Sequence, residues 1–253
     1  MTTTAERRAT SAGRDALALS FVAEMYGVQL DHLARLAGAS TRQARAMVTR
    51  WSARGLASSA VLSSGPRWVW LTRAGLTACG APYRQLPPAL PRLPHLRAVT
   101  AVRLALEAAP GYRAGQAHWR SERHLRARTG GRVGLREHLP DAEVHWPDLP
   151  EAASAPGWAG ECWAIEAELT PKTVARTIMI MRELLGRTGD YGSPANEARR
   201  PGVPPRHARA IYLCSPEATP AVLRARTQLG SLAGRIEVRE LPADAYLPGG
   251  ASR

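Results

Sequence analysis

The chain has 253 residues, enough for one large domain or two small ones that each bury a core. Its formal net charge is +13, which favours a polyanionic partner, most commonly nucleic acid, although ribosomal and membrane-surface proteins share this character. No apolar run approaches the roughly 20 residues that span a bilayer, and residues 1–13 lack the apolar stretch of a secretion signal. We therefore expect a cytoplasmic protein with no membrane partner.

The cysteines and the basic residues narrow the chemistry. Cys79, Cys162 and Cys214 are too few and too scattered for a disulfide framework or a zinc site, so we expect small core residues. Of the 34 basic residues, 33 are arginines and one, Lys172, is a lysine. This bias is typical of a GC-rich genome, which weakens any argument that a given arginine was selected for its fork geometry.

The segment before residue 85 predicts a small helical domain with a hairpin. The expected elements are helices over residues 15–26, 30–37 and 41–54, two strands within residues 57–71, and a further helix beginning near residue 71. Ser40 is a good N-cap for the third helix, and residues 63–65 read Ser-Ser-Gly, a hairpin turn signal. This order is typical of a winged helix-turn-helix.

In a winged helix the third helix enters the major groove and the hairpin contacts phosphates or the minor groove. Arginine and glutamine can contact base edges or phosphates. The predicted DNA-binding residues are Arg42, Gln43, Arg45, Thr49 and Arg50 on the helix and Arg67 in the hairpin. An alternative interpretation is a winged helix used for protein contact, with its charged face merely solvated.

A proline-rich segment divides the chain. Four prolines lie in residues 86–94, where they remove backbone donors and fix φ, which favours a stiff linker. The predicted organisation is a flexible tail over 1–13, a winged helix over 14–84, a linker over 85–94, a nuclease-like domain over 95–243 and a flexible tail over 244–253.

After the linker the pattern becomes mixed α/β. Helices are expected over residues 96–108, 117–128, 173–187 and 219–229, strands over 133–139, 141–146, 162–169, 208–214 and 235–240, and a loop over 189–206. Helix, three strands, helix and strand is the core order of the restriction-endonuclease-like fold. The predicted fold class is therefore α+β or α/β, a winged helix followed by a restriction-endonuclease-like domain with a mixed central sheet.

Acidic residues cluster on two of these strands. Residues i and i+2 of a strand share a face. Asp141 and Glu143 therefore lie on one face of their strand, and Glu166 and Glu168 lie on one face of theirs. Neighbouring strands would bring three or four carboxylates together, and such oxygen ligands suit Mg²⁺ or Mn²⁺. We predict a metal site at Asp141, Glu166 and Glu168. The alternative is that these carboxylates pair with arginines and serve structure alone.

Two further residues extend this hypothesis. Lys172 follows the second acidic strand, where it can orient an attacking water or stabilise developing charge. Glu122, on the preceding helix, can complete the site from the side. The predicted catalytic set is Asp141, Glu166, Glu168, Lys172 and Glu122. The histidines lack tight metal-ligand spacing, so His138 and His145 are interpreted as surface or core residues, although both can approach the acids.

Four short motifs carry a resemblance to a known family. They are Trp119-x-x-Glu122-Arg123, His138-x-Pro140-Asp141-Ala142, Ile165-Glu166-Ala167-Glu168-Leu169-Thr170-x-Lys172 and Ile211-Tyr212-Leu213-Cys214. They resemble landmarks of the replication-relaxation family of bacterial plasmids and mobile elements, over about residues 14–240. The resemblance implies a winged helix joined to a PD-(D/E)xK-like domain, and a DNA-binding role in plasmid replication, relaxation or mobilisation. Other plasmid replication or transfer proteins are the implied partners.

The resemblance also assigns positions within the nuclease motif, and one of them departs from the pattern. Asp141 matches the first acid and Glu166 the second, but Glu168 stands where the motif has lysine. Lys172 is then a displaced lysine that reaches back from the next helix. The leading hypothesis is a DNA-binding protein with a Mg²⁺- or Mn²⁺-dependent nicking or cleaving site. The alternatives are a non-catalytic DNA-binding regulator on a degenerate nuclease fold and a protein-interaction adaptor.

Overall fold

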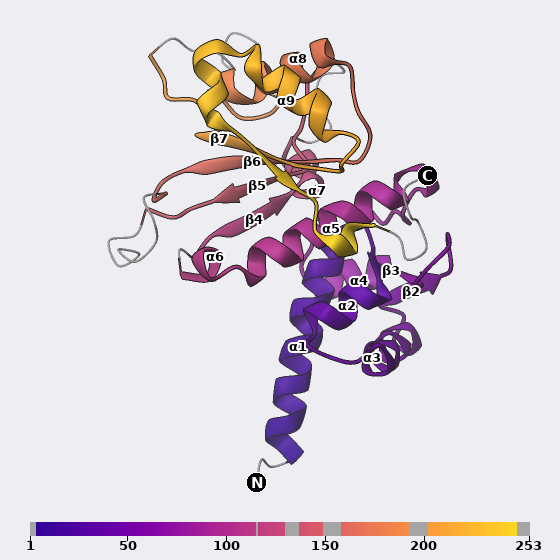
Figure 1. Cartoon of the computed structure of the whole chain (residues 1–253). Coiled ribbons are helices and arrows are strands. Elements are labelled where there is room, and N and C mark those ends of the chain that lie inside the picture. Colours follow the sequence, from indigo (N-terminus) through magenta and orange to yellow (C-terminus); the bar gives the residue numbers. More distant parts are fainter. Residues whose placement is uncertain (1–3, 115, 130–136, 149–157, 193–201, 247–253) are drawn as a thin grey trace. The chain divides into compact units, whose positions relative to one another are not determined.

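The structure is a computed structural model of the chain, and it describes residues 4–114, 116–129, 137–148, 158–192 and 202–246 (Figure 1). The chain forms two compact units. The first contains Met1–Leu104 and Asp244–Arg253, and the second contains Ala105–Ala243. The division falls within helix α5 (Leu93–Ala108), beyond the proline-rich segment 85–94 that the sequence predicts as a linker.

The first unit combines helices with a small antiparallel sheet. Its elements are α1 (Thr4–Glu24), β1 (Val28–Gln29), α2 (Leu30–Leu36), α3 (Thr41–Ala53), β2 (Ala57–Ala60), β3 (Trp68–Leu71) and α4 (Arg73–Ala78). The strands lie in the order β1-β3-β2. The expected order of elements is found, but the predicted tail over residues 1–13 is helical from Thr4 onward. Residues 4–13 contain alanine and arginine and no proline, which favours extension of the helix.

Local chemistry explains the ends of these elements. Ser40 and Gln43 form a reciprocal capping box that starts α3, as expected from the N-cap signal. A Cβ atom at Gly75 would lie 1.9 Å from the Leu56 carbonyl oxygen, so only glycine lets α4 approach the chain after α3. Trp51 of α3 and Trp68 of β3 are completely buried and anchor the core of this unit.

The segment from residue 244 onward, predicted to be a flexible tail, begins with residues that pack on the first unit. The His32 ring contacts the Asp244 backbone oxygen at 3.1 Å, and Arg35 donates to the Asp244 carboxylate. The prediction is wrong for residues 244–246 because these polar contacts come from α2, more than two hundred residues earlier, and leave no local signal in the sequence.

Arg97 on α5 connects this segment to the rest of the unit. Its side chain is almost fully buried, and its guanidinium donates to the Asp31 carboxylate at 2.8 Å, to the Gln29 side chain and to the Tyr246 carbonyl at 2.8 Å. A buried guanidinium is tolerated only when its donors are satisfied. Arg97 therefore holds the start of α2 and residue 246 on one helix.

The second unit is built on a five-stranded mixed sheet. Its elements are α6 (Pro110–Ala114), β4 (His118–Ser121), α7 (Glu122–Arg128), β5 (Ala142–His145), β6 (Cys162–Glu168), α8 (Val174–Gly186), β7 (Arg209–Cys214), α9 (Thr219–Thr227) and β8 (Ile236–Glu240). The order is β4-β5-β6-β7-β8. Strands β4, β5 and β6 pair antiparallel, whereas β6, β7 and β8 pair parallel. The mixed α+β class expected from the sequence is confirmed.

One predicted helix is wrong in its first half. Residues 117–128 were expected to be helical throughout, but His118–Ser121 form strand β4 and the helix begins at Glu122. Ser121 is the N-cap, and its side chain accepts from the His124 backbone N–H at 3.2 Å. The predicted strand over 133–139 lies mostly outside the described residues, and 137–139 have no regular structure.

One face of the sheet is covered by α8 and α9, which provide the connections between the parallel strands (Figure 1). The core on this face contains Ala164, Ala210, Tyr212 and Cys214 of the sheet, packed against Met181 and other apolar residues of the two helices. The even-numbered residues of β6 and β7 therefore point toward α8 and α9, because side chains alternate along a strand. This face carries all the polar clusters described below.

The contacts of Arg97 generate a stability prediction. Arg97→Met should lower the free energy of unfolding by about 3 kcal/mol, because it leaves Asp31 without its guanidinium partner and Tyr246 without its donor. Urea unfolding followed by tryptophan fluorescence measures this. Arg54→Met, at an exposed position at the end of α3, is the matched control and should stay within about 0.5 kcal/mol of wild type. Equal stability of the two variants would contradict a structural role for Arg97.

Candidate functional site

Strand register brings two predicted acids together. Ala142 of β5 pairs with Ile165 of β6, so the preceding residue, Asp141, stands opposite Glu166. The Asp141 carboxylate accepts a hydrogen bond from the Ala167 backbone N–H at 2.8 Å. Asp141 is thereby held next to the glutamates of β6.

Each glutamate of β6 has a basic partner. The buried Glu166 carboxylate lies 2.7 Å from His138 Nε2, and the Glu168 carboxylate contacts the Lys172 ammonium group. The side chains of His138 and Lys172 are 20% and 40% exposed, so both partners reach solvent while the carboxylates do not. We call Asp141, Glu166, Glu168, Lys172 and His138 the acid–lysine cluster.

Burial and charge oppose each other in this cluster. Burial raises the pKa of Glu166, and the nearby His138 charge only partly offsets that effect. Burial acts to lower the pKa of His138, but the charge of Glu166 and the hydrogen bond to it prevail and raise it. His138, interpreted from the sequence as a surface or core histidine, is thus a direct partner of a predicted site residue. The Pro-Asp spacing after His138 was the available signal.

Glu122 borders the cluster through its backbone. Its N–H donates to the Asp141 carbonyl at 2.9 Å, whereas its carboxylate accepts from Arg126, one turn later, at 2.9 and 2.7 Å. The role of Glu122 in completing the site from the side stays a prediction. Its position fixes the backbone of Asp141.

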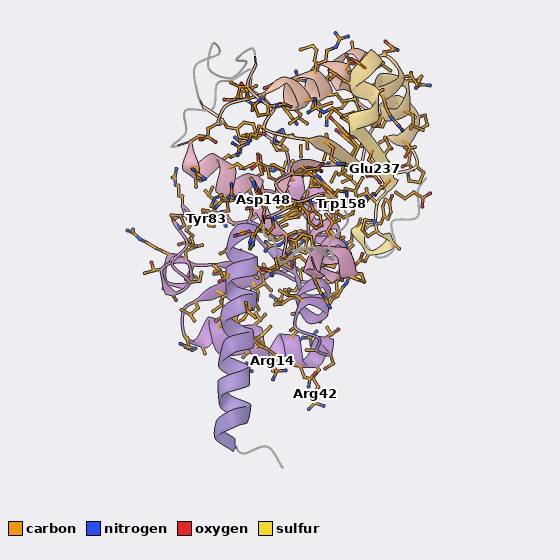
Figure 2. The ribbon with its side chains drawn as sticks, turned by 90° about the vertical axis from the view of Figure 1, so that its left-hand side faces the viewer. Arg14, Arg42, Tyr83, Asp148, Trp158 and Glu237 are labelled. Atoms are coloured by element: carbon orange, nitrogen blue, oxygen red, sulfur yellow. The ribbon has the colours of Figure 1, made fainter. Side chains whose placement is uncertain are left out.

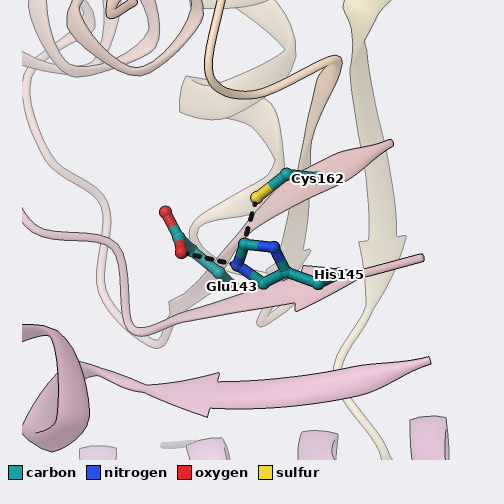
Figure 3. A group of neighbouring side chains, drawn as sticks. All are labelled: Glu143, His145 and Cys162. Carbon is teal, nitrogen blue, oxygen red and sulfur yellow. Dashed lines mark hydrogen bonds and ion pairs between the residues drawn. The ribbon is translucent and has the colours of Figure 1, made fainter. Parts of the chain in front are cut away.

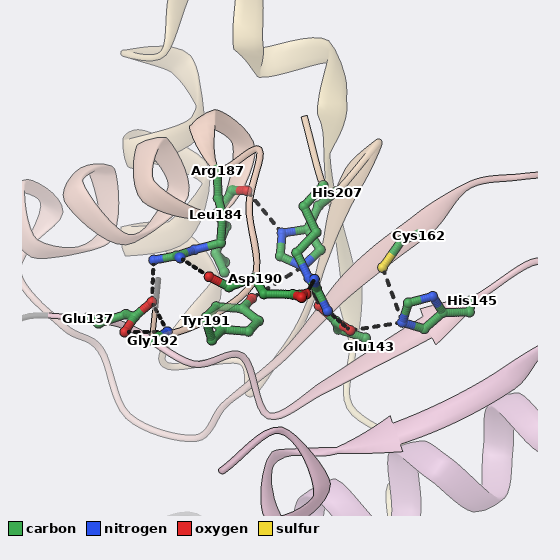
Figure 4. Close-up of polar contacts among 11 residues, drawn as sticks. Glu137, Glu143, His145, Cys162, Leu184, Arg187, Asp190, Tyr191, Gly192 and His207 are labelled. Atoms are coloured by element: carbon green, nitrogen blue, oxygen red, sulfur yellow. Dashed lines mark hydrogen bonds and ion pairs between the residues drawn. The ribbon is translucent and has the colours of Figure 1, made fainter. Parts of the chain in front are cut away.

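Glu143 shares the sheet face with Asp141 but belongs to a different network (Figure 4). Its fully buried carboxylate accepts from Arg206 through two nitrogen atoms, lies 2.9 Å from His207 Nε2 and lies 2.8 Å from His145 Nε2. Burial acts to raise its pKa, but these hydrogen bonds outweigh burial and hold the pKa of Glu143 well below its usual range. We call this group the Glu143 network.

Three donor atoms of this region lie close enough to share a cation. In the described part of the chain, Glu143, His145 and Cys162 are the group whose ligand atoms all lie within 4.8 Å of one another (Figure 3). Sequence spacing did not reveal this group because the residues come from two strands joined by a long connection. The contacts around Glu143 do not favour a cation, because Arg206 and His207 already compensate the carboxylate.

The environment of Cys162 also disfavours metal binding and nucleophilic attack by its thiol. Burial and the nearby Glu143 charge raise the pKa of the Cys162 thiol, whereas the thiolate is the form that coordinates metals and acts as a nucleophile. Its Sγ atom lies 3.5 Å from the same His145 nitrogen that contacts Glu143. One nitrogen cannot both withdraw the thiol proton and donate to the carboxylate at the same time, so the three residues do not form a catalytic triad.

The acid–lysine cluster offers a more suitable donor set. Hard cations such as Mg²⁺ and Mn²⁺ prefer carboxylate oxygen, and Asp141, Glu166 and Glu168 provide it. Their ligand atoms do not all lie within 4.8 Å of one another, because each carboxylate turns to its own partner. Lys172 and His138 would have to move aside for a cation to bind, and their partial exposure allows this.

The predicted DNA-binding residues of α3 divide into two groups. Arg42 and Arg45 are exposed and form no ion pair within the described part of the chain, and Figure 2 shows Arg42 projecting from the helix. Gln43 is engaged in the capping box, where its side chain accepts from the Ser40 N–H at 2.8 Å. Arg50 pairs with Asp15 of α1 at 3.3 Å. Arg42 and Arg45 are therefore the more available cations.

A groove lies between α3 and the β2–β3 hairpin. Its volume is about 780 Å³, and Arg45, Thr49, Ser59 and Arg67 are among its lining residues. The Thr49 hydroxyl donates to the Arg45 carbonyl at 3.0 Å, and Arg67 donates to the Ser59 carbonyl at 3.0 Å. Two predicted cations thus face one groove from its two walls.

Comparison of the chain with models of protein families, with curated proteins and with solved structures finds no match. The resemblance to the replication-relaxation family therefore remains a proposal. Among the described residues, no helix combines the length and the apolar character needed to cross a membrane.

The Glu143 network predicts a defined pH dependence. Because the folded pKa of Glu143 lies below its ordinary value of 4.5, its contribution to stability is present above that pH and is lost as the pH falls further. Glu143→Gln should lower the free energy of unfolding at pH 7 by about 3 kcal/mol and should flatten the acid loss. Urea titrations from pH 7 to pH 3 measure both effects.

Glu237→Gln is the matched control, because Glu237 pairs with Arg239 on the surface and both side chains are exposed. It should leave both quantities nearly unchanged. Wild-type stability of Glu143→Gln at pH 7 would show that the network is not a structural anchor.

Proposed function

We propose that the first unit is a winged helix-turn-helix that binds DNA. The order α2, α3, β2 and β3 supports this, because α3 presents its exposed polar face beside the hairpin. Arg42 and Arg45 have no acidic partner in the described part of the chain, so their charge is available to phosphates. The net charge of +13 adds a long-range attraction to a polyanion.

We propose further that the acid–lysine cluster acts on a phosphodiester of the bound DNA with a divalent cation. One observation carries this proposal: Asp141 and Glu166 come from strands paired at one edge, and Glu168 and Lys172 stand next to them. Buried carboxylates on a sheet cost free energy, which a functional cation site would explain. The cofactor class is Mg²⁺ or Mn²⁺.

Each residue of the acid–lysine cluster would have its own role. Asp141, Glu166 and Glu168 would hold the ion. When bound, such an ion polarises a phosphate oxygen and lowers the pKa of a coordinated water. Lys172, released from Glu168, would donate to the developing charge on the phosphate or orient the attacking water. His138 would give up its Nε2 contact with Glu166 and remain beside the site.

The alternative is a DNA-binding regulator without catalysis. A specific observation favours it: each carboxylate already has a partner inside the protein, and Glu168 occupies the position where the nuclease motif has lysine. In that case the second unit would have a nuclease-like fold without catalytic activity, and it would bind DNA or another protein. Either function is consistent with the resemblance to proteins of plasmids and mobile elements. Other plasmid replication or transfer proteins would be further partners.

DNA binding is tested with a charge-matched pair of double variants. Arg42→Ala with Arg45→Ala should weaken binding to duplex DNA at least tenfold at about 150 mM salt and reduce the salt slope by about 2. Arg182→Ala with Arg224→Ala removes the same charge from exposed positions on α8 and α9 and should have a smaller effect. Fluorescence anisotropy at several salt concentrations measures both. Equal losses would mean that binding reflects net charge alone.

Cleavage is tested on supercoiled plasmid with Mg²⁺ or Mn²⁺. Wild type should nick the DNA, whereas Asp141→Ala and Glu166→Ala should not, because each removes a proposed ligand. Lys172→Met should also lose cleavage yet bind Mn²⁺ at least as tightly, because it removes the cation that competes for Glu168. Intact plasmid that remains bound by wild type with either metal would favour the non-catalytic regulator.

A further inference from the structure

Tyr212 carries a buried hydroxyl that the fold does not use. The side chain is fully buried in the core between the sheet and α8, and its hydroxyl has no hydrogen-bond partner within the described part of the chain. An unsatisfied buried hydroxyl costs roughly 1–3 kcal/mol, so such a group is uncommon without a reason. The other buried tyrosine of this unit, Tyr191, does have a partner, His207, at 3.2 Å.

The position of Tyr212 places this hydroxyl beside the acid–lysine cluster. Tyr212 of β7 is the register partner of Glu166 on β6, and both residues lie on the sheet face covered by α8 and α9. The next even residue of β6 is Glu168, opposite Cys214. Because adjacent strands lie about 4.8 Å apart, the phenol stands next to the two carboxylates without bonding to either.

The hydroxyl is available as a donor. Burial, followed by the charges of Glu166 and Glu168, raises the pKa of Tyr212 well above its usual value. A phenol hydroxyl beside two carboxylates can donate to a water or a hydroxide.

We propose that Tyr212 is a positioning residue of the cation site, and that its hydroxyl donates to a water molecule bound to the divalent cation held by Asp141, Glu166 and Glu168. This inference rests on the proposed function of the acid–lysine cluster. The alternative is that the hydroxyl has no function and simply lacks a hydrogen-bond partner among the described residues, as the indole N–H of Trp51 does in the first unit. The two interpretations predict different effects of removing one oxygen atom.

The test compares Tyr212→Phe with wild type in the full-length chain, using MnCl₂ as the probe. Without metal, Tyr212→Phe should unfold at the wild-type temperature or above it, because no hydrogen bond is lost and an unsatisfied group is removed. Its affinity for Mn²⁺, measured by isothermal titration calorimetry, should fall about tenfold. An unfolding temperature that is unchanged or higher, together with weaker Mn²⁺ binding, is the result expected if the hydroxyl contributes to binding the ion.

Two controls separate the possible failures. Tyr191→Phe should lose thermal stability, because it removes the contact with His207, and should keep wild-type Mn²⁺ affinity. Asp141→Asn should abolish Mn²⁺ binding if the cation site exists. Binding that depends on Asp141 but is unchanged in Tyr212→Phe would overturn the role of Tyr212 and leave the cation site standing. Wild-type protein that binds no Mn²⁺, or binds it independently of Asp141, would overturn both.

Discussion

Burying carboxylates on one face of a sheet is the physical constraint on which the second unit depends. Glu143, Glu166 and Glu168 are 0%, 2% and 5% exposed, and all three point toward the side covered by α8. Ionised groups in such a place are stable only when cations or hydrogen-bond donors compensate them. The partners of each carboxylate therefore determine whether that carboxylate serves structure or is available to a ligand.

Two kinds of compensation are found on this face. Glu143 is held by Arg206 and by His207, which is itself completely buried and contacts the Leu184 carbonyl. This network ties the connection between α8 and β7 to strand β5, and several donors hold the one carboxylate. Within the described part of the chain, the Glu166 and Glu168 carboxylates instead each contact one basic side chain, and that side chain reaches solvent. Exchangeable partners are what a site needs if a cation or a phosphate is to replace them.

The elements that depend on local signals could be predicted from the sequence. The capping box at Ser40 and the apolar spacing of α3 are encoded within a few residues, and the structure contains both. Strand β4 was missed because it is only four residues long and runs directly into α7, so its sequence continues a helical pattern. A Ser121 N-cap inside the predicted helix was the overlooked signal.

The candidate site was predicted in part for the same reason. Strand alternation and adjacency were enough to bring Asp141 close to Glu166, since both arise from the β5–β6 pairing. The partners of Glu143 were not predictable, because Arg206 lies 63 residues later in the chain and is one of many arginines. The docking of Asp244 on α2 was hidden by an even longer separation. Long-range pairing of common residue types leaves no pattern in a single sequence.

We propose that the acid–lysine cluster, and not the Glu143 network, binds a divalent cation. Anomalous diffraction from crystals soaked in MnCl₂ tests this most directly, because it locates the ion without relying on activity. We expect one strong peak within coordinating distance of Asp141, Glu166 and Glu168, with Lys172 moved away from Glu168. A peak among Glu143, His145 and Cys162 instead, or no peak in the second unit, would contradict it.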